Sequence, residues 1–522
     1  MLDSRAGQDG GAGAAGPGGG DEGGRGGGGV SRRALLRAGA LGGGTAAALA
    51  AGGAAASAAS AAGKAGAASA ASKVSAARAA RHPAFSLFSQ EDLNFETLFT
   101  LGGAGYGTSE VGEVVTAVNA INRAGATYQN YFDTFAATAR RVSELAGREL
   151  AAGHQASALS AYLRAASYWD ACLFFVLGTS HRAKEASVYA AMQRNWNSAA
   201  QLFDPPFQRV QIPYGSTYMP GYFLQPGGAG IARPTVILNN GSDAQNIDLY
   251  AYGGAAALER GYNALIFEGP GQGSMLFERE IFFRPDWEKV VTPIVDWLTA
   301  RPEVDASRIA ITGWSLCGES VIRAAAFEHR LAAVVADPGV LDAWLAYPAF
   351  LRKLFSSGAS KAEINHIWNH DIVPHLNAQD RFTFAKRSEL FGRQFLLAGR
   401  AGRVFSDLYD LGQILMRLNC SQNAPEVTSP TLVNFYQEDT FFPGPTQARA
   451  VYKLLPESLP RAFHTFTVAE GAQFHDAPMA PQTRNQVVFD WLDGIIGGGW
   501  PAAPGRAATV AGHDGTVLRG QG

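Results

Sequence analysis

Residues 308–320, RIAITGWSLCGES, constrain the fold of this chain more than any other stretch. A short apolar run leads through Gly313 and Trp314 to Ser315, and a helical pattern, SLCGESVIRAAAFE, follows. A strand, a sharp turn and a helix with a serine at the apex are what a nucleophile elbow requires, because the strained turn holds the hydroxyl above a sheet. The sequence therefore predicts that Ser315 is a nucleophile.

The motif departs from the usual GxSxG pattern at its last position, where Cys317 stands in place of glycine and Gly318 follows. That position must be small so that the helix can pass close to the neighbouring strand, and cysteine is among the smaller apolar residues. The alternative is a serine that caps a helix in any α/β domain, since GxS alone means little in a chain with 62 glycines.

From residue 205 onward, short apolar runs alternate with helical stretches. The first two runs, PFQRVQIP and STYMPGYFLQ, are expected to form an antiparallel pair, and the later strands are expected at PTVILN, NALIFE, RIAITGW, LAAVVAD, PTLVNFY and FHTFTVA. Strand and helix in alternation predict the α/β class, with a mostly parallel sheet covered by helices on both faces. In such sheets ligands bind at the carboxyl ends of the strands.

Two loops that follow predicted strands carry the groups that a serine nucleophile needs. Asp439 comes after PTLVNFY, and His475 comes after FHTFTVA. A hydroxyl requires an imidazole to take its proton and a carboxylate to hold that imidazole in the right tautomer. The chain order Ser, Asp, His is that of α/β-hydrolases, so we predict the triad Ser315, Asp439 and His475. Glu438 is the alternative carboxylate, whereas His464 is expected inside a strand in a structural role.

An oxyanion hole is expected from the backbone N–H groups of Leu316 and Ser242, which lies in the loop after PTVILN. The alternative for that loop is an ordinary glycine turn. Three further carboxylates could assist the chemistry. These auxiliary candidates are Asp243 in the same loop, Glu268 after NALIFE and Asp337 after LAAVVAD, where a structural turn is the competing interpretation.

Residues 1–84 are set aside from the fold. The segment SRRALLR precedes a long Ala/Gly-rich run with AxA-like sites, which is typical of a twin-arginine (Tat) export signal. That run is too poor in Leu, Ile, Val and Phe to favour a stable membrane span. We expect the Tat export machinery as a partner and a periplasmic or secreted location. The alternative is a disordered low-complexity tail on a cytoplasmic protein.

The rest of the chain divides by pattern. Apolar residues recur at three and four spacing before residue 204, which predicts a helical domain over 85–204. The α/β catalytic domain is expected over 205–500, with a helical insertion at about 340–428 whose position suits a lid over the site. The tail, 501–522, has loop composition and is expected to be disordered.

Composition and charge exclude several other classes of site. Lys and Arg number 43 against 45 Asp and Glu, a net charge of −2 that favours neither nucleic acid nor an acidic membrane. Three scattered cysteines give no disulfide framework or zinc site. His366 and His370 lack a third metal ligand, and the glycine-rich EGPGQG lacks the spacing and lysine of a phosphate loop. We expect a small-molecule substrate, no cofactor and no metal; a homodimer is left open.

Several long motifs resemble the FrsA-like α/β-hydrolases: FEGPGQG, FRPDWEKVVTPIVDWLTARPEVD, the elbow followed by RAAAFEHRLAAVVADPGV, and EGAQFH with NQVVFDWLD. The chain is most similar to a branch that has an N-terminal helical domain, which GHQASALSAYLRAASYWDA resembles. That branch contains dihydroxypseudooxynicotine hydrolase and the fungal polyketide-shortening hydrolases of melanin pathways. The resemblance covers most of 85–500 and implies Ser315, Asp439 and His475 as the triad. Cys317 departs from the family pattern, and so does Glu268, where the family usually has Asp.

The resemblance implies hydrolysis of a carbon–carbon bond next to a ketone, in an aryl ketone or polyketide-like substrate. Ser315 would attack the ketone, and the adduct would expel a carbanion or enolate before water cleaves the acyl-enzyme. A carboxylesterase or an acyl-peptide or amide hydrolase would use the same groups. An acyltransferase and a non-catalytic ligand-binding member of the fold are further alternatives.

Overall fold

The structure, a computed structural model, describes residues 86–227 and 230–498. The export signal expected in residues 1–84 and the tail at 501–522 lie outside the described residues.

A single eight-stranded sheet forms the centre of the described chain. Its strands are β1 (Gln208–Tyr214), β2 (Thr217–Leu224), β3 (Arg233–Asn239), β4 (Asn263–Phe267), β5 (Val304–Trp314), β6 (Ala333–Asp337), β7 (Thr431–Tyr436) and β8 (Arg461–Phe466). The spatial order is β1-β2-β4-β3-β5-β6-β7-β8, with β1–β2 and β2–β4 antiparallel and every other pair parallel. The predicted α/β class, with an antiparallel pair leading into a parallel sheet, is confirmed.

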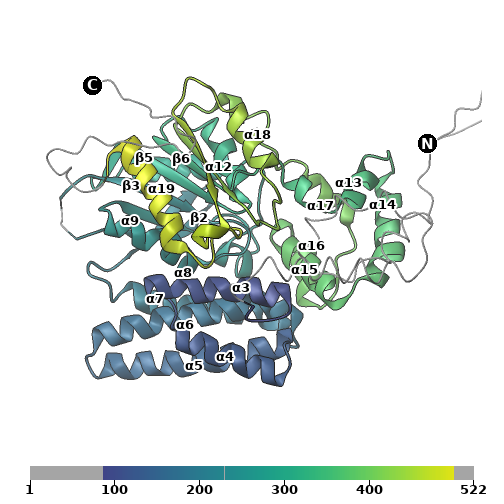
Figure 1. The fold of residues 1–522 in the computed structure, drawn as a ribbon, viewed down its shortest axis with the longest axis horizontal. Helices are drawn as coiled ribbons and strands as arrows, with labels where there is room; N and C mark the ends of the chain where they lie inside the picture. Colours follow the sequence, from purple (N-terminus) through teal and green to yellow (C-terminus); the bar gives the residue numbers. More distant parts are fainter. Residues whose placement is uncertain (1–85, 228–229, 499–522) are drawn as a thin grey trace, which may run out of the picture.

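The central strands are continuous apolar runs because helices cover them. Every residue of β3, β4, β6 and β7 is buried, as expected for parallel strands with both faces covered. The helices that follow its strands are α8 (Asn246–Leu249), α9 (Ala255–Glu259), α10 (Gly273–Phe277), α11 (Glu288–Thr299), α12 (Cys317–Ala325), α18 (Thr446–Leu454) and α19 (Pro481–Ile496). Of these, α9, α11, α12 and α19 pack against the sheet. Figure 1 shows α9, α12 and α19 beside the strands.

A helical region precedes the sheet and lies along one side of it, with α3 and α7 on the side that faces the sheet (Figure 1). It comprises α3 (Glu91–Gly102), α4 (Val111–Ala124), α5 (Tyr128–Ala151), α6 (Gln155–Phe175) and α7 (Glu185–Ala200). Its core is continuous with that of the sheet. The Trp196 ring on α7, for example, packs on Phe207, Tyr222 and Tyr250, so the two parts share buried surface.

A helical insertion separates β6 from β7 and forms a lobe beside the sheet (Figure 1). Its helices are α13 (Ala349–Phe355), α14 (Lys361–Ile367), α15 (Ala378–Ser388), α16 (Arg393–Arg400) and α17 (Leu408–Leu415). Arg400 on α16 forms a 2.8 Å ion pair with Glu185, which ties the lobe to the helical region. Within the described residues, no three His, Cys, Asp or Glu side chains gather as a metal site, and no helix is long and apolar enough to cross a membrane.

Candidate active site

The predicted elbow is present at the carboxyl end of β5. Strand β5 ends at Trp314 and α12 begins at Cys317, while Ser315 between them has a left-handed backbone with φ of 51°. Its N–H donates to the Asp337 carbonyl at 2.8 Å. A Cβ at Gly318 would overlap the Pro338 carbonyl oxygen. The small residue that the close packing of α12 requires is therefore at position 318, and the buried Cys317 fits at the usual glycine position.

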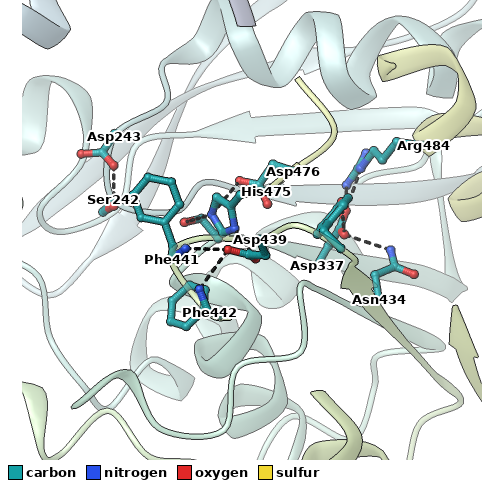
Figure 2. A network of polar contacts seen from close by, with 12 residues as sticks. Ser242, Asp243, Asp337, Asn434, Asp439, Phe441, Phe442, His475, Asp476 and Arg484 are labelled. Carbon is teal, nitrogen blue, oxygen red and sulfur yellow. Dashed lines mark hydrogen bonds and ion pairs between the residues drawn. The ribbon is translucent and has the colours of Figure 1, made fainter. Parts of the chain in front are cut away.

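The structure brings together the three residues predicted from loop positions. Ser315 Oγ lies 2.8 Å from His475 Nε2, and His475 Nδ1 lies 2.7 Å from Asp439 Oδ2. The other carboxylate oxygen of Asp439 accepts hydrogen bonds from the N–H groups of Phe441 and Phe442 at 2.7 and 2.9 Å (Figure 2). Both carboxylate oxygens are thus held, and the imidazole is aligned with the hydroxyl.

Two rival residues are placed elsewhere. Asp439, and not its neighbour Glu438, is the carboxylate bonded to the imidazole. The backbone N–H of Glu438 donates to the Gln473 carbonyl at 2.9 Å. His464 lies within β8, as expected for a structural histidine.

Charge around the imidazole favours its protonated form. Burial acts to lower the pKa of His475, but the carboxylates of Asp439 and Asp476 outweigh it and raise the pKa to about 9. The rings of Phe441 and Phe442 pack beside the imidazole, with centroids 4.9 and 5.7 Å away. These rings keep water away from the imidazole, which strengthens the attraction between protonated His475 and the Asp439 carboxylate.

The loop after β3 lies against the elbow. A Cβ at Gly241 would come within 2.8 Å of both Ser315 Cβ and the Trp314 carbonyl oxygen, so only glycine allows this approach. Gln272 donates to the Asn240 and Gly241 carbonyls at 2.7 and 2.9 Å. The side-chain oxygen of Gln272 accepts from Gly269 N–H at 3.0 Å. The glycine-rich EGPGQG turn therefore fixes the position of this loop.

The two backbone N–H groups expected in the oxyanion hole are not used in hydrogen bonds among the described residues. Within residues 86–227 and 230–498, neither the Leu316 N–H nor the Ser242 N–H donates a hydrogen bond to a protein group. Both remain available to a substrate oxygen bound beside Ser315.

A cavity of about 690 Å³, counting the part open to solvent, contains Ser315 and His475. Helices α3 and α6 of the helical region, the loop after β3 and Arg387 of the insertion complete its wall. Aromatic rings make up much of that wall, from Phe95, Phe99, Phe174, Trp314 and Phe441. The cavity therefore suits an aromatic or otherwise apolar group next to the hydroxyl.

Carboxyl groups line another part of the cavity. Asp170 on α6 and Asp248 on α8 hydrogen-bond to each other, and burial together with the neighbouring carboxylate raises the pKa of Asp170. Burial also raises the pKa of Glu96 to about 7, against the attraction of Arg387. These residues were not predicted as site residues. The one available signal was Asp170, a lone charge within the apolar stretch SYWDACLFF.

Of the three auxiliary carboxylates, Asp243 lies at the cavity wall, where it accepts a 2.7 Å hydrogen bond from the Ser242 hydroxyl (Figure 2). Asp243 therefore lies in the wall of the cavity that contains Ser315. Asp243 also pairs with Arg387. The pairing with Arg387 links the loop to the insertion.

Glu268 and Asp337 are not among the residues that line the cavity. Glu268 accepts hydrogen bonds from Tyr189 and Asn246 at 2.6 and 2.8 Å, which joins α7 to α8. Asp337 is fully buried and bound by Arg484 on α19, with Nε 2.7 Å from its carboxylate (Figure 2). Each of these carboxylates holds structural elements together.

Comparisons with known proteins agree with this architecture. No protein-family model matches the chain. The 20-hydroxy-prefusarin hydrolase FUS2 of Gibberella moniliformis is 27% identical over 424 residues, which are 78% of this chain and 97% of that protein. The hydrolyase poxO of Penicillium oxalicum is 31% identical over 297 residues, 55% of this chain and 68% of its own length.

Among solved structures, that of 2,6-dihydroxy-pseudo-oxynicotine hydrolase superposes with a TM-score of 0.57 at 21% identity, over 77% of this chain and 96% of that one. Further curated relatives are named alpha/beta hydrolases. The resemblance seen in the motifs is confirmed: with its eight-stranded sheet, its elbow and the helical region before them, the chain belongs to the α/β-hydrolase family.

Proposed function

We propose that the protein is a serine hydrolase in which Ser315, His475 and Asp439 form a catalytic triad. The observation that carries the proposal is the pair of hydrogen bonds, 2.8 Å from Ser315 Oγ to His475 Nε2 and 2.7 Å from His475 Nδ1 to Asp439 Oδ2, at the wall of the cavity. A serine hydroxyl becomes a nucleophile when an imidazole accepts its proton and a carboxylate stabilises the imidazolium that forms.

The reaction then passes through an acyl-enzyme. Ser315 Oγ adds to the substrate carbonyl as its proton moves to His475 Nε2, and the N–H groups of Leu316 and Ser242 bind the oxygen that becomes negative. Collapse of the adduct releases the leaving group. Water, activated by His475, then hydrolyses the acyl-enzyme and restores the serine.

The substrate class that we propose is an aryl ketone or polyketide-like ketone, cleaved at the carbon–carbon bond next to the carbonyl. Two observations support it. The motifs resemble those of hydrolases that cleave such bonds, and five aromatic side chains line the cavity beside Ser315. The relative FUS2 is named a hydrolase of 20-hydroxy-prefusarin. An ester would use the same groups with a more stable leaving group, so both classes belong in the test.

Products and labelling together test this function. The protein is incubated with aryl ketones, β-diketones and aryl esters, and the products are identified by mass spectrometry. A second sample is treated with a fluorophosphonate probe, and the labelled peptide is identified in the same way. We expect a carboxylic acid and a ketone from each β-diketone, and a probe adduct on the peptide that contains Ser315. Labelling without ketone cleavage would restrict the function to ester hydrolysis. A protein that neither labels nor turns over any substrate would contradict the proposal.

The oxyanion loop gives a second prediction. Alanine at Gly241 places a methyl group within 2.8 Å of Ser315 Cβ and of the Trp314 carbonyl, so the loop must move away from the elbow. Loss of one oxyanion donor typically lowers kcat by about 10²–10³. We expect Gly241→Ala to lower kcat by this factor with little change in KM. Gly227→Ala, in a loop where a Cβ meets no atom within 4 Å, is the matched control.

A further inference from the structure

Asp476, which directly follows His475, is a buried carboxyl group that the triad does not use. Asp476 is 4% exposed, and it lines the cavity together with Ser315. One carboxyl oxygen, Oδ2, lies 3.4 Å from His475 Nε2, the nitrogen that faces the serine (Figure 2). The other, Oδ1, has no hydrogen-bond partner in the part of the chain that the structure describes. A buried polar atom without a partner is costly, and this one belongs to a residue that lines the cavity containing Ser315.

The backbone holds this carboxyl in place. Asp476 and Ala477 both have left-handed conformations, with φ of 60° and 50°, which non-glycine residues adopt rarely. The turn is fixed by a 2.8 Å hydrogen bond from Ala477 N–H to the Phe474 carbonyl. The Tyr252 hydroxyl donates to the Pro478 carbonyl at 2.7 Å. Strained backbone of this kind persists where the surroundings impose it, and it is common at active sites.

The charged and titratable groups around Asp476 come from every element that packs on it. They are His475 beside it, Asp439 after β7, Asp337 at the end of β6, Arg484 on α19, Tyr436 on β7 and Tyr252 before α9, with Arg387 of the insertion acting on His475. Burial raises the pKa of Asp476 to about 7, against the attraction of His475, and the two other aspartates act in the same direction as burial. Asp476 is therefore a much weaker acid than an exposed aspartate and can hold a proton near neutral pH.

Cleavage of a carbon–carbon bond needs one proton at the leaving carbon, because the leaving group is a carbanion or enolate. In a Ser-His-Asp triad the imidazolium can supply this proton, but its Nε2–H points at the serine oxygen when the adduct forms. A carboxyl group beside Nε2 offers a donor in a different position on the cavity wall. An activated ester differs, because its phenolate leaves without a proton. A second acid beside Nε2 is thus useful for a ketone and of little use for such an ester.

We propose that Asp476 is a catalytic acid that donates its proton to the leaving carbon of a ketone substrate. This inference rests on the proposed carbon–carbon hydrolase function and adds a residue to it. The position of the carboxyl, on the cavity wall and beside the reacting nitrogen, carries the assignment.

The protons and bonds balance through one turnover. Ser315 Oγ bonds to the carbonyl carbon, and its proton moves to His475 Nε2. The bond from the carbonyl carbon to the leaving carbon breaks, and that carbon takes the proton of Asp476. The imidazolium then returns a proton to the Asp476 carboxylate across the 3.4 Å gap. Water finally adds to the acyl group, and its proton passes through His475 to Ser315 Oγ.

The test compares two substrates in the same variants: the β-diketone 1-phenyl-1,3-butanedione and the ester p-nitrophenyl acetate. Asp476→Asn keeps the size of the side chain, and asparagine also tolerates a left-handed backbone, but an amide cannot donate this proton. General acid catalysis typically contributes about 10²–10⁴ in rate. We expect the ratio of ketone to ester turnover to fall by at least about 100-fold. In Asp476→Glu, which keeps an acid, the ratio should recover in part.

Glu319→Gln is the matched control. Glu319 is also a fully buried carboxyl, and burial raises its pKa to about 8, but it lies on α12 outside the cavity wall. Its variant should keep the wild-type ratio of ketone to ester turnover. Thermal unfolding and fluorophosphonate labelling of every variant report folding and an intact Ser315.

The pH dependence provides a second, independent readout. In the reactive form His475 is neutral and Asp476 is protonated. This form is the minor arrangement of the single proton that the pair holds between its two ionisations, because the imidazole is the more basic group. Because the two groups titrate as a pair, ketone turnover should be bell-shaped between the two ionisations, with limbs near pH 7 and 9. Ester turnover needs only the base and should rise to an alkaline plateau. In Asp476→Asn the remaining ketone turnover should no longer decrease at alkaline pH.

Two results would overturn the inference. Equal loss of ketone and ester turnover in Asp476→Asn would assign the side chain to positioning His475, and an unchanged ratio with full activity would remove it from the chemistry. Failure of the proposed hydrolase function looks different, since the wild-type protein itself would then fail to label or to cleave the ketone.

Discussion

Ser315→Ala is expected to lower turnover of both ketones and esters by about 10⁶-fold, the loss seen when the serine of a comparable triad is removed. The hydroxyl is the only group of the side chain that reaches His475, 2.8 Å away, and it is the atom that the acyl group would bond to. Alanine can occupy the same backbone conformation as serine, so the fold should persist. Steady-state kinetics and thermal unfolding measure the two effects separately.

Ser320→Ala serves as the control for this change. Ser320 is also on the segment after β5, but it is fully buried, bonded to Glu319 and absent from the cavity wall. Its variant should keep turnover within a small factor of wild type. Unchanged turnover in Ser315→Ala would exclude an acyl-enzyme on this residue.

Asp439→Asn is expected to lower kcat by about 10⁴, as the equivalent change does in a serine protease. The backbone N–H groups of Phe441 and Phe442 hold one carboxylate oxygen, so an amide oxygen can take its place. The amide nitrogen then faces His475 Nδ1 and donates to it. This forces the proton of a neutral imidazole onto Nε2, where it blocks acceptance of the serine proton.

The same substitution should shift the pH profile toward lower pH. Asp439 is the main charge that raises the pKa of His475 against burial, so its removal makes the imidazole less basic. Ester kinetics between pH 5 and 10 measure the shift. Glu438→Gln is the matched control, because the carboxylate 2.7 Å from His475 Nδ1 belongs to Asp439 and Nε2 faces Ser315. A greater loss in Glu438→Gln than in Asp439→Asn would reassign the triad carboxylate.

The fold and the three convergent residues were predictable because their signals are local. Each central strand is a continuous apolar run, since both of its faces are covered, and the order of such runs limits the topology. Ser315, Asp439 and His475 each follow one of these strands. The carboxyl ends of parallel strands meet at one edge, so three loop positions in the sequence lead to one place in the fold.

The rest of the site depends on packing between distant segments, which no local pattern encodes. Glu96 and Asp170 enter the cavity only because the helical region lies over the edge of the sheet. Asp476 faces the imidazole because its backbone is left-handed without a glycine to indicate it. Glu268 and Asp337 showed the opposite case: both follow strands, as catalytic residues do, yet their carboxylates are held by internal hydrogen bonds.

The contact between the end of α3 and the turn after His475 limits how this protein can be recombined with its relatives. A side chain at Gly102 would overlap the Pro478 carbonyl oxygen, and the Tyr252 hydroxyl lies within hydrogen-bonding distance of the Phe99 and Pro478 carbonyls. The end of α3 and the turn after His475 are therefore packed tightly against each other, although they are far apart in the sequence. A chimera that exchanges the helical region but not the turn after His475 would misplace His475. Both segments of such a chimera must therefore come from the same parent protein.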